Sequence, residues 1–374
     1  MRVGFDAKRA FHNLRGLGNY SRELIRGLSL IENDWELFLF GPGLKKKSFS
    51  TWSDELTNTT NVFGPKYNPM SSLWRTFCLG PRANKLKLDL YHGLSHELPV
   101  GIKTKQVVTV HDLLWYKIPQ NFSFIDRFTY RKKLRHSLDR ADKILAISES
   151  TKNDLIEIMG VQENKVQVHY QPCHHSFLSP HSPELLESYQ KQLNLPEHFI
   201  LSIGAIEPNK NTLYTVKVFE RVKQKFPGLK LVIVGDGGLY KNELFEFIDT
   251  KNLRSDIIHF SFLNTVSLKA LYQLCDAFLF PSHYEGFGLP VIEALSLRAP
   301  VIASSQDNVR EAGGPGCLYV DPNELEDGVD AVSKILNNSE EVISMINSGY
   351  QYVQRFHWKE TTRNLVQIYK NIVQ

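Results

Sequence analysis

Short apolar runs alternate with longer segments of helical periodicity along the whole chain. Runs of this length are typical of buried strands, and the intervening segments are long enough for a helix to connect two parallel strands. Between residues 213 and 226, apolar residues recur every three or four positions and stop before Pro227-Gly228, as expected for a connecting helix. The alternation therefore predicts an α/β fold built on parallel sheets. The predicted strands are residues 3–5, 36–40, 107–110, 143–147, 166–168, 199–203, 231–234, 277–280, 300–303 and 317–320.

The length of the chain calls for two domains. A single hydrophobic core rarely serves more than about 250–300 residues, and this chain has 374. Several prolines follow the predicted strand at 166–168 and interrupt the alternation before the next strand begins. We therefore place the boundary there and predict two Rossmann-like domains, residues 1–170 and residues 171–357. A last helical segment, residues 358–374, could pack on either domain, including back on the first.

Composition excludes several classes of protein. The net charge of +4 is small for this length and does not indicate a nucleic-acid partner. The four cysteines lie far apart with no C-x-x-C pair, which indicates reduced thiols rather than a zinc site. No apolar stretch approaches the roughly 20 residues of a membrane-spanning helix, and the amino terminus enters a strand-like run directly. We expect a cytoplasmic protein without a signal peptide, metal or cofactor.

Residues with unusual chemistry follow the ends of five predicted strands. In open parallel sheets, ligands bind at the carboxyl ends of the strands. If both sheets direct these ends toward each other, one cleft between the domains collects all five segments. The segments are His111-Asp112, Gly204 with Lys210, residues 235–238, residues 281–288 and Ser304-Ser305.

The segment from Glu285 to Leu295 is the most informative of these. Its two glycines let backbone amides approach a ligand closely, and Pro290 suits the first turn of a helix. The amino end of that helix would offer N–H groups and a positive dipole to a phosphate or a polar sugar. Glu285 and Glu293 would then accept hydrogen bonds from sugar and ribose hydroxyls. For Glu293, a helix-start glutamate that only favours the dipole is the structural alternative.

This segment resembles the E-x7-E signature of retaining glycosyltransferase family 4. Two further segments resemble the family's glycine-rich amino-terminal loop and its phosphate loop, in the family's order: Gly16-Leu17-Gly18-Asn19-Tyr20 and residues 204–211. The resemblance covers residues 15 to 320 and implies the GT-B fold, in which two Rossmann-like domains face each other across a cleft. It implies a hexosyltransferase, and both loops look most like those of mannosyltransferases that use GDP-mannose in bacterial polysaccharide and lipopolysaccharide synthesis.

The resemblance also implies a role for each site residue. Three would be catalytic: His111 beside the reacting face of the donor sugar, Glu285 holding that sugar, and Lys210 facing the diphosphate. Glu293 would hold the ribose hydroxyls, and no residue is expected to bind a metal. The implied donor-binding residues are Gly16, Leu17, Gly18, Gly204, Asn209, Gly286, Phe287, Gly288, Leu289 and Glu293.

The chain departs from the family at the phosphate loop. Many members carry arginine directly after the loop glycine, where this chain has Ala205. Others carry it before the lysine, where this chain has Asn209. Lys210 is therefore the visible cation of the second domain that could stabilise charge on a leaving diphosphate.

A basic segment in the first domain suggests a further partner. Residues 126–143 contain seven basic and three acidic residues, with aromatic and aliphatic residues between them. One interpretation is a solvated basic helix, and the other is a dock for an anionic membrane that carries a lipid-linked acceptor. The expected partners are thus a nucleotide-sugar donor and a saccharide or lipid-linked acceptor, with possible peripheral attachment to the inner face of the plasma membrane.

Two other functions remain open at this stage. A nucleotide-sugar epimerase of the same fold would release a free sugar without an acceptor. A non-catalytic protein would bind the nucleotide sugar and never convert it. A nicotinamide oxidoreductase is disfavoured, because residues 3–8 lack the G-x-G-x-x-G motif after the first strand.

Overall fold

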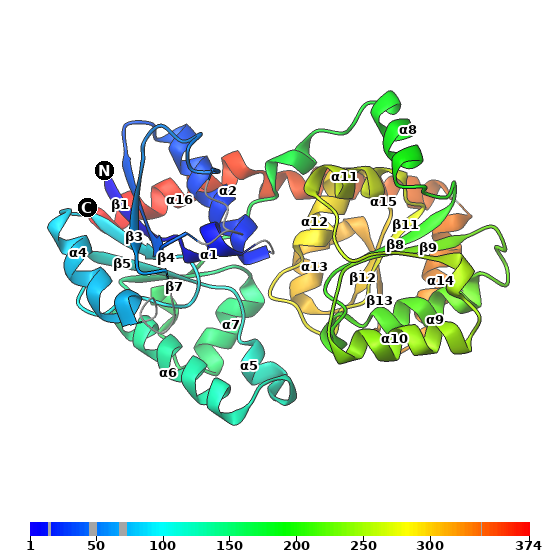
Figure 1. Ribbon diagram of the computed structural model, residues 1–374, viewed down its shortest axis with the longest axis horizontal. Coiled ribbons are helices and arrows are strands. Elements are labelled where there is room, and N and C mark those ends of the chain that lie inside the picture. The colour runs from blue at the N-terminus through cyan, green and yellow to red at the C-terminus, as the bar shows by residue number, and fades with distance from the viewer. Residues whose placement is uncertain (14–15, 45–50, 67–72, 338) are drawn as a thin grey trace. The chain divides into compact units, whose positions relative to one another are not determined.

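The structure is a computed structural model and describes residues 1–13, 16–44, 51–66, 73–337 and 339–374. The chain divides into two units (Figure 1). Unit 1 comprises residues 1–174 together with 356–374, and unit 2 comprises residues 175–355. Each unit is built on one sheet whose strand pairs are all parallel among the described residues. Each sheet thus has one carboxyl edge, at which the residues that follow its strands are gathered.

The sheet of unit 1 has seven strands in the order β3-β2-β1-β4-β5-β6-β7. The strands are β1 (Arg2–Asp6), β2 (Glu36–Pro42), β3 (Thr59–Gly64), β4 (Leu90–Gly93), β5 (Lys105–Val110), β6 (Lys143–Ala146) and β7 (Val166–Val168). The α-helices are α1 (Lys8–His12), α2 (Gly16–Ile31), α4 (Leu79–Lys85), α5 (Leu114–Lys117), α6 (Phe124–Arg140), α7 (Glu149–Glu157) and α16 (Trp358–Val373), and a π-helical turn η1 (Trp74–Cys78) precedes α4.

Alternate residues of these strands pack on opposite faces of the sheet and form two separate cores. Phe5 and Leu39 belong to one core, and Phe40 and Val110 belong to the other. The carboxyl-terminal helix α16 completes the first core and lies beside α2, red beside blue in Figure 1. The helices approach closely because Gly27 has no Cβ, which would lie 2.2 Å from the Thr362 hydroxyl.

The sheet of unit 2 has six strands in the order β10-β9-β8-β11-β12-β13. The strands are β8 (Phe199–Ile203), β9 (Lys230–Val234), β10 (Ile257–Phe260), β11 (Ala277–Phe280), β12 (Val301–Ser304) and β13 (Cys317–Val320). The α-helices are α8 (Pro183–Gln192), α9 (Thr212–Val222), α10 (Leu239–Thr250), α11 (Thr265–Leu274), α12 (Leu289–Ser296), α13 (Asp307–Gly313), α14 (Leu325–Leu336) and α15 (Glu340–Val353). A 3-10 turn, η5 (Pro208–Lys210), follows β8.

The predicted strands all occur, with small changes at their ends, but the sequence analysis missed β3, β4 and β10. One local prediction is wrong: the glycine-rich segment Gly16-Leu17-Gly18 is not a loop but the first turn of α2. Gly18 is required there because a Cβ would lie 1.9 Å from the carbonyl oxygen of Asn13. Among the described residues, no helix is long and apolar enough to cross a membrane.

Candidate functional site

Lys210 and Glu285 form an ion pair at the carboxyl edge of the unit 2 sheet. Lys210 ends the η5 turn after β8, and Glu285 follows β11, the neighbouring strand. The Lys210 Nζ lies 2.6 Å from Glu285 Oε1, and the two side chains are 25% and 13% exposed. The fold thus brings two residues that were both predicted to be catalytic, and that lie 75 positions apart in the chain, into direct contact. Both side chains remain accessible to solvent.

The backbone holds this pair in place. The N–H of His283 donates to the carbonyl oxygen of Asn209 at 2.8 Å, which joins the η5 turn to the segment after β11. The Asn209 side chain is buried, so it belongs to the support beneath Lys210. Gly204 lies beneath the lysine stem, since a Cβ there would be 3.8 Å from Lys210 Cγ. The predicted phosphate loop is therefore a short turn that presents its lysine outward.

The segment from Gly286 to Leu289 leads into α12. Gly288 has φ +139°, and a Cβ there would lie 3.0 Å from the Ala312 Cβ, so a side chain would strain this turn. The Phe287 side chain is buried, which leaves only its backbone to face a ligand. No side chain caps the amino end of α12, and its first turn has no acidic residue. Its dipole is therefore available to an anion.

Glu293 lies within α12, and Tyr272 of α11 donates a hydrogen bond to it. The Tyr272 hydroxyl is 3.2 Å from Glu293 Oε2. Burial raises the pKa of Glu293 to about 8, and the hydrogen bond from Tyr272 opposes part of that rise. At neutral pH and without a ligand this carboxyl is therefore largely protonated.

Replacement of Glu293 tests its predicted role. If ribose hydroxyls donate to its ionised form, Glu293→Ala should weaken nucleoside diphosphate binding by about 1–3 kcal/mol. Affinity in the native protein should also rise with pH up to about 8, because binding favours the ionised carboxylate. Calorimetry at pH 7 in two buffers of different ionisation enthalpy should then detect proton release on binding.

Glu293→Gln is the matched control for that measurement. Its amide cannot titrate, so any pH dependence that remains in this variant belongs to the nucleotide. Proton release that is equal in the native protein and in Glu293→Gln would contradict a ribose-binding role for Glu293.

In unit 1, His111 directly follows β5 and is buried with both ring nitrogens paired. Its Nε2 donates to the Leu94 carbonyl at 2.8 Å, and its Nδ1 accepts from Gln171 Nε2 at 2.7 Å. Burial lowers the pKa of His111 to about 3, so the ring is neutral at physiological pH. The Tyr20 ring and the imidazole pack nearly at right angles, with the ring centroids 4.8 Å apart. Tyr20 belongs to α2, and thus the end of β5 and the amino-terminal part of α2 are joined.

The predicted donor-binding residues Gly16, Leu17 and Gly18 lie in the first turn of α2. Gly16, Leu17 and Gly18 begin a helix of 16 residues whose dipole is positive at this end. Its first turn contains no acidic residue to offset that charge. These three residues and His111 belong to unit 1, and the other predicted site residues belong to unit 2.

Several polar partners were missed by the sequence analysis. Tyr272 and Gln171 support Glu293 and His111, respectively, and neither residue belongs to a motif. Arg75 of η1 pairs with Asp6, the last residue of β1, and, at 3.1 Å, with Glu97. The signal for this last network was present, because Asp6 is an acidic residue at the end of a predicted strand.

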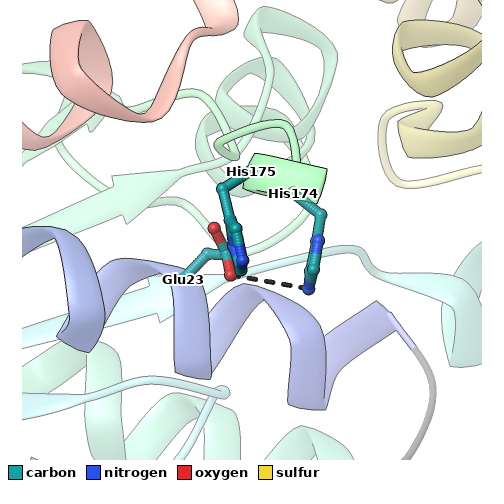
Figure 2. A group of neighbouring side chains, drawn as sticks. All are labelled: Glu23, His174 and His175. Atoms are coloured by element: carbon teal, nitrogen blue, oxygen red, sulfur yellow. Dashed lines mark ion pairs between the residues drawn. The ribbon is translucent and has the colours of Figure 1, made fainter. Parts of the chain in front are cut away.

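Glu23 of α2 is a buried carboxylate that contacts His174. Figure 2 draws Glu23 with His174 and His175, and its dashed line marks the contact between Glu23 Oε1 and His174 Nε2 at 3.5 Å. The Glu23 side chain is only 3% exposed, so a protonated His174 would compensate a buried carboxylate. Carboxylate and imidazole groups are also metal ligands in proteins, which makes chelation a necessary test of metal independence.

Two family models match the chain. The model of glycosyltransferase family 4 matches residues 14–176, and that of glycosyl transferases group 1 matches residues 186–352. The chain is a glycosyltransferase built from these two domains. The enzyme class predicted from the sequence, a glycosyltransferase, is therefore confirmed.

Curated relatives of this glycosyltransferase include enzymes named for surface polysaccharides. It is 27% identical to O-antigen chain mannosyltransferase B of Escherichia coli, over 99% of this chain and 100% of that protein. It is 28% identical to O-antigen chain mannosyltransferase RfbU of Salmonella typhimurium, over 70% of this chain and 67% of that protein. Serotype-specific mannosyltransferase WbdA of Escherichia coli is 26% identical, and the chain spans 36% of its length.

Solved structures of other proteins share the fold. Anabaena Alr3699/HepE, in complex with UDP, superposes with a TM-score of 0.78 at 16% identity, over 99% of each chain. WaaG, a glycosyltransferase involved in lipopolysaccharide biosynthesis, superposes with a TM-score of 0.72 at 15% identity, over 98% of this chain and 99% of that one. The predicted α/β architecture of the GT-B class, with two parallel-sheet domains, is therefore confirmed.

Proposed function

We propose that the chain is a retaining hexosyltransferase that moves mannose from GDP-mannose to a saccharide or lipid-linked acceptor in surface polysaccharide synthesis. The Lys210–Glu285 pair at the carboxyl edge of unit 2 carries the proposal, because it combines a cation for a diphosphate with an acceptor for sugar hydroxyls. The similarity to O-antigen chain mannosyltransferase B over its whole length supports mannose as the sugar.

In the proposed reaction, the bond between the anomeric carbon and the diphosphate oxygen breaks and a bond from that carbon to the acceptor oxygen forms on the same face. The acceptor's hydroxyl proton passes to the departing diphosphate, so no protein carboxylate acts as nucleophile. Lys210 and the amino end of α12 stabilise the negative charge that grows on the leaving group. Glu285 orients the sugar and Glu293 the ribose.

Ligand-dependent stability and product analysis test this proposal. A nucleotide that binds only the folded protein at 100 times its Kd adds about 2.7 kcal/mol to the free energy of unfolding. We expect GDP to raise the melting temperature more than UDP, ADP or dTDP. NMR of the product should show a retained anomeric configuration, and turnover should continue in EDTA.

The controls separate the rival functions. Stronger stabilisation by UDP than by GDP would mean that the donor is a UDP-sugar rather than GDP-mannose. An inverted product, or loss of turnover in EDTA, would contradict the proposed mechanism. Release of a sugar isomer without any acceptor would indicate an epimerase. Donor binding without turnover over a panel of mannose-terminated acceptors would indicate a non-catalytic protein.

Helix α6 supports the proposal that unit 1 contacts an anionic membrane. Three apolar side chains at its amino end are strongly exposed: Phe124 by 80%, Ile125 by 75% and Phe128 by 61%. The exposed basic residues Arg131 and Lys132 follow in the same helix. Apolar side chains flanked by cations suit a bilayer with anionic headgroups.

Vesicle sedimentation tests this contact. We expect binding to vesicles that contain phosphatidylglycerol, with affinity falling as salt rises, and little binding to vesicles of phosphatidylcholine alone. The double variant Phe124→Ser/Phe128→Ser should lose most of the binding. Ile343→Ser, which changes an apolar residue of α15 that is 49% exposed, is the matched control. Equal binding by both variants would show that α6 is a solvated surface helix.

A further inference from the structure

A cavity in unit 2 lies at the amino edge of its sheet, opposite the carboxyl edge that carries Lys210 and Glu285. Its volume is about 670 Å³, within the range of small-molecule sites in proteins. Four of its lining residues each directly precede a strand: His198 before β8, Leu229 before β9, Asp276 before β11 and Pro300 before β12.

This position separates the cavity from the proposed donor site. β8 and β9 have five residues each and span about 15 Å between the two edges of the sheet. A nucleotide sugar held at the carboxyl edge therefore has no access to the cavity through the packed strands, whose side chains are buried.

One side of the cavity is apolar. Ile335 and Leu336 contribute from the end of α14, and Val342 and Ile346 from the first turns of α15. Leu229 completes this surface. An occupant would gain affinity by burying hydrocarbon against these residues.

The rim of the cavity carries three ionisable side chains, those of His198, Lys225 and Asp276. Asp276 accepts hydrogen bonds from the Phe199 N–H at 2.7 Å and from His198 Nδ1 at 3.2 Å, so its carboxylate is already occupied. Asp276 also raises the pKa of His198, which favours the imidazolium and balances the carboxylate. Lys225 lines the cavity as well, and no ion pair of Lys225 occurs among the residues that the structure describes.

We propose that this cavity binds a small amphipathic anion, whose hydrocarbon body contacts α14 and α15 and whose carboxylate or phosphate faces Lys225. An apolar wall alone would accept any hydrocarbon. The exposed cation at the rim selects a negative head group, because an ammonium without a partner gains a charge-assisted hydrogen bond from it. The site is independent of the proposed transferase reaction, since it shares no residue with the carboxyl edge.

Octanoate and octan-1-ol are the probes, since they share a hydrocarbon chain and differ in head-group charge. Calorimetry and saturation-transfer NMR on the full chain should show one saturable octanoate site and about tenfold weaker binding of octan-1-ol. Lys225→Gln should lower octanoate affinity by about tenfold and leave octan-1-ol unchanged. Lys217→Gln, at an exposed position on α9, should change neither.

Two further measurements keep the proposal open to refutation. Ile346→Trp should fill the cavity and abolish binding of both probes, with folding checked by circular dichroism. Saturating GDP and UDP should leave octanoate binding intact. The proposal fails if native protein shows no saturable binding, if Lys225→Gln binds octanoate normally, or if a nucleotide displaces it. None of these outcomes depends on transferase activity, so they leave the proposed function untouched.

Discussion

Lys210→Ala is expected to lower kcat by about 10²–10³, the loss seen when one donor to a developing anion is removed. The reason is the charge on the departing diphosphate, which a cation meets more strongly in a poorly hydrated site than in water. Relatives that carry arginine in this loop share that task between two cations, whereas this chain has Ala205 and Asn209 at the corresponding positions. Kinetics with the identified donor, at saturating concentrations, measure the loss.

The structure supplies controls for this experiment. Lys210→Ala also leaves Glu285 without its ion-pair partner, so Lys210→Ala/Glu285→Gln separates loss of the cation from an unpaired carboxylate. Lys241→Ala removes another lysine that pairs with an acidic residue, Asp236, after the neighbouring strand β9. That variant should keep near-normal turnover.

A partial rescue is expected from Ala205→Arg in the Lys210→Ala background. Ala205 is half-buried directly after Gly204, so a guanidinium there could reach solvent and a phosphate. Asn209 is a poorer position for arginine, because its side chain is buried. Near-normal turnover by Lys210→Ala would mean that the charge is met elsewhere. Arg15 of unit 1 would be the next candidate, although it lies outside the described residues.

The sequence pattern predicted the strands that stand out as apolar runs and missed three others. β3 is an edge strand whose first residues, Thr59 to Asn61, are polar and largely exposed, so it lacks an apolar run. β4 and β10 have only four residues each, and the histidines His92 and His259 interrupt their apolar runs. Hydrophobic patterning detects a strand through its run of apolar side chains. A short strand that contains a hydrogen-bonded polar residue lacks such a run and is missed.

The sequence predicted the residues of the candidate site that belong to a motif. It did not predict the contacts that these residues make with distant segments of the chain. Lys210 and Glu285 were both assigned from the sequence, but their pairing depends on β8 and β11 being neighbours in the sheet. Gln171 reaches His111 across 60 residues of chain, and no local pattern marks it. The helical start of α2 was missed because its two glycines are poor helix formers, whereas the close approach to Asn13 requires Gly18.

The stability of unit 1 is expected to fall steeply as the pH drops from about 6.5 toward 4, because three histidines are buried as neutral rings. His92, His111 and His169 are at most 3% exposed. His92 contacts the Tyr369 hydroxyl and His169 bonds to the Thr361 carbonyl at 3.0 Å, so both hold α16 on the unit. Burial lowers the pKa of His169 to about 4 and that of His111 to about 3, and it lowers the pKa of His92 well below its ordinary value.

The direction of the effect follows from proton binding. Below about pH 6.5 the unfolded chain protonates these histidines while the folded unit does not, so the unfolded state binds more protons and stability falls with pH. Each histidine contributes about 1.4 kcal/mol per pH unit until its folded pKa is reached. Three together give about 4 kcal/mol per pH unit, a large fraction of the 5–15 kcal/mol that stabilises a typical domain.

Hydrogen exchange of the amides in β4, β5 and α16, followed between pH 7 and pH 4.5, measures the loss within unit 1 alone. In His169→Gln, a side-chain amide can still donate to Thr361 but cannot titrate, so the slope should fall by about 1.4 kcal/mol per pH unit. His198→Gln is the contrasting control, because Asp276 raises the pKa of that exposed histidine, which lies in unit 2. It should leave the slope of unit 1 unchanged. If His169→Gln loses stability with pH as steeply as the native protein, the buried rings are not the groups that make the unit sensitive to acid.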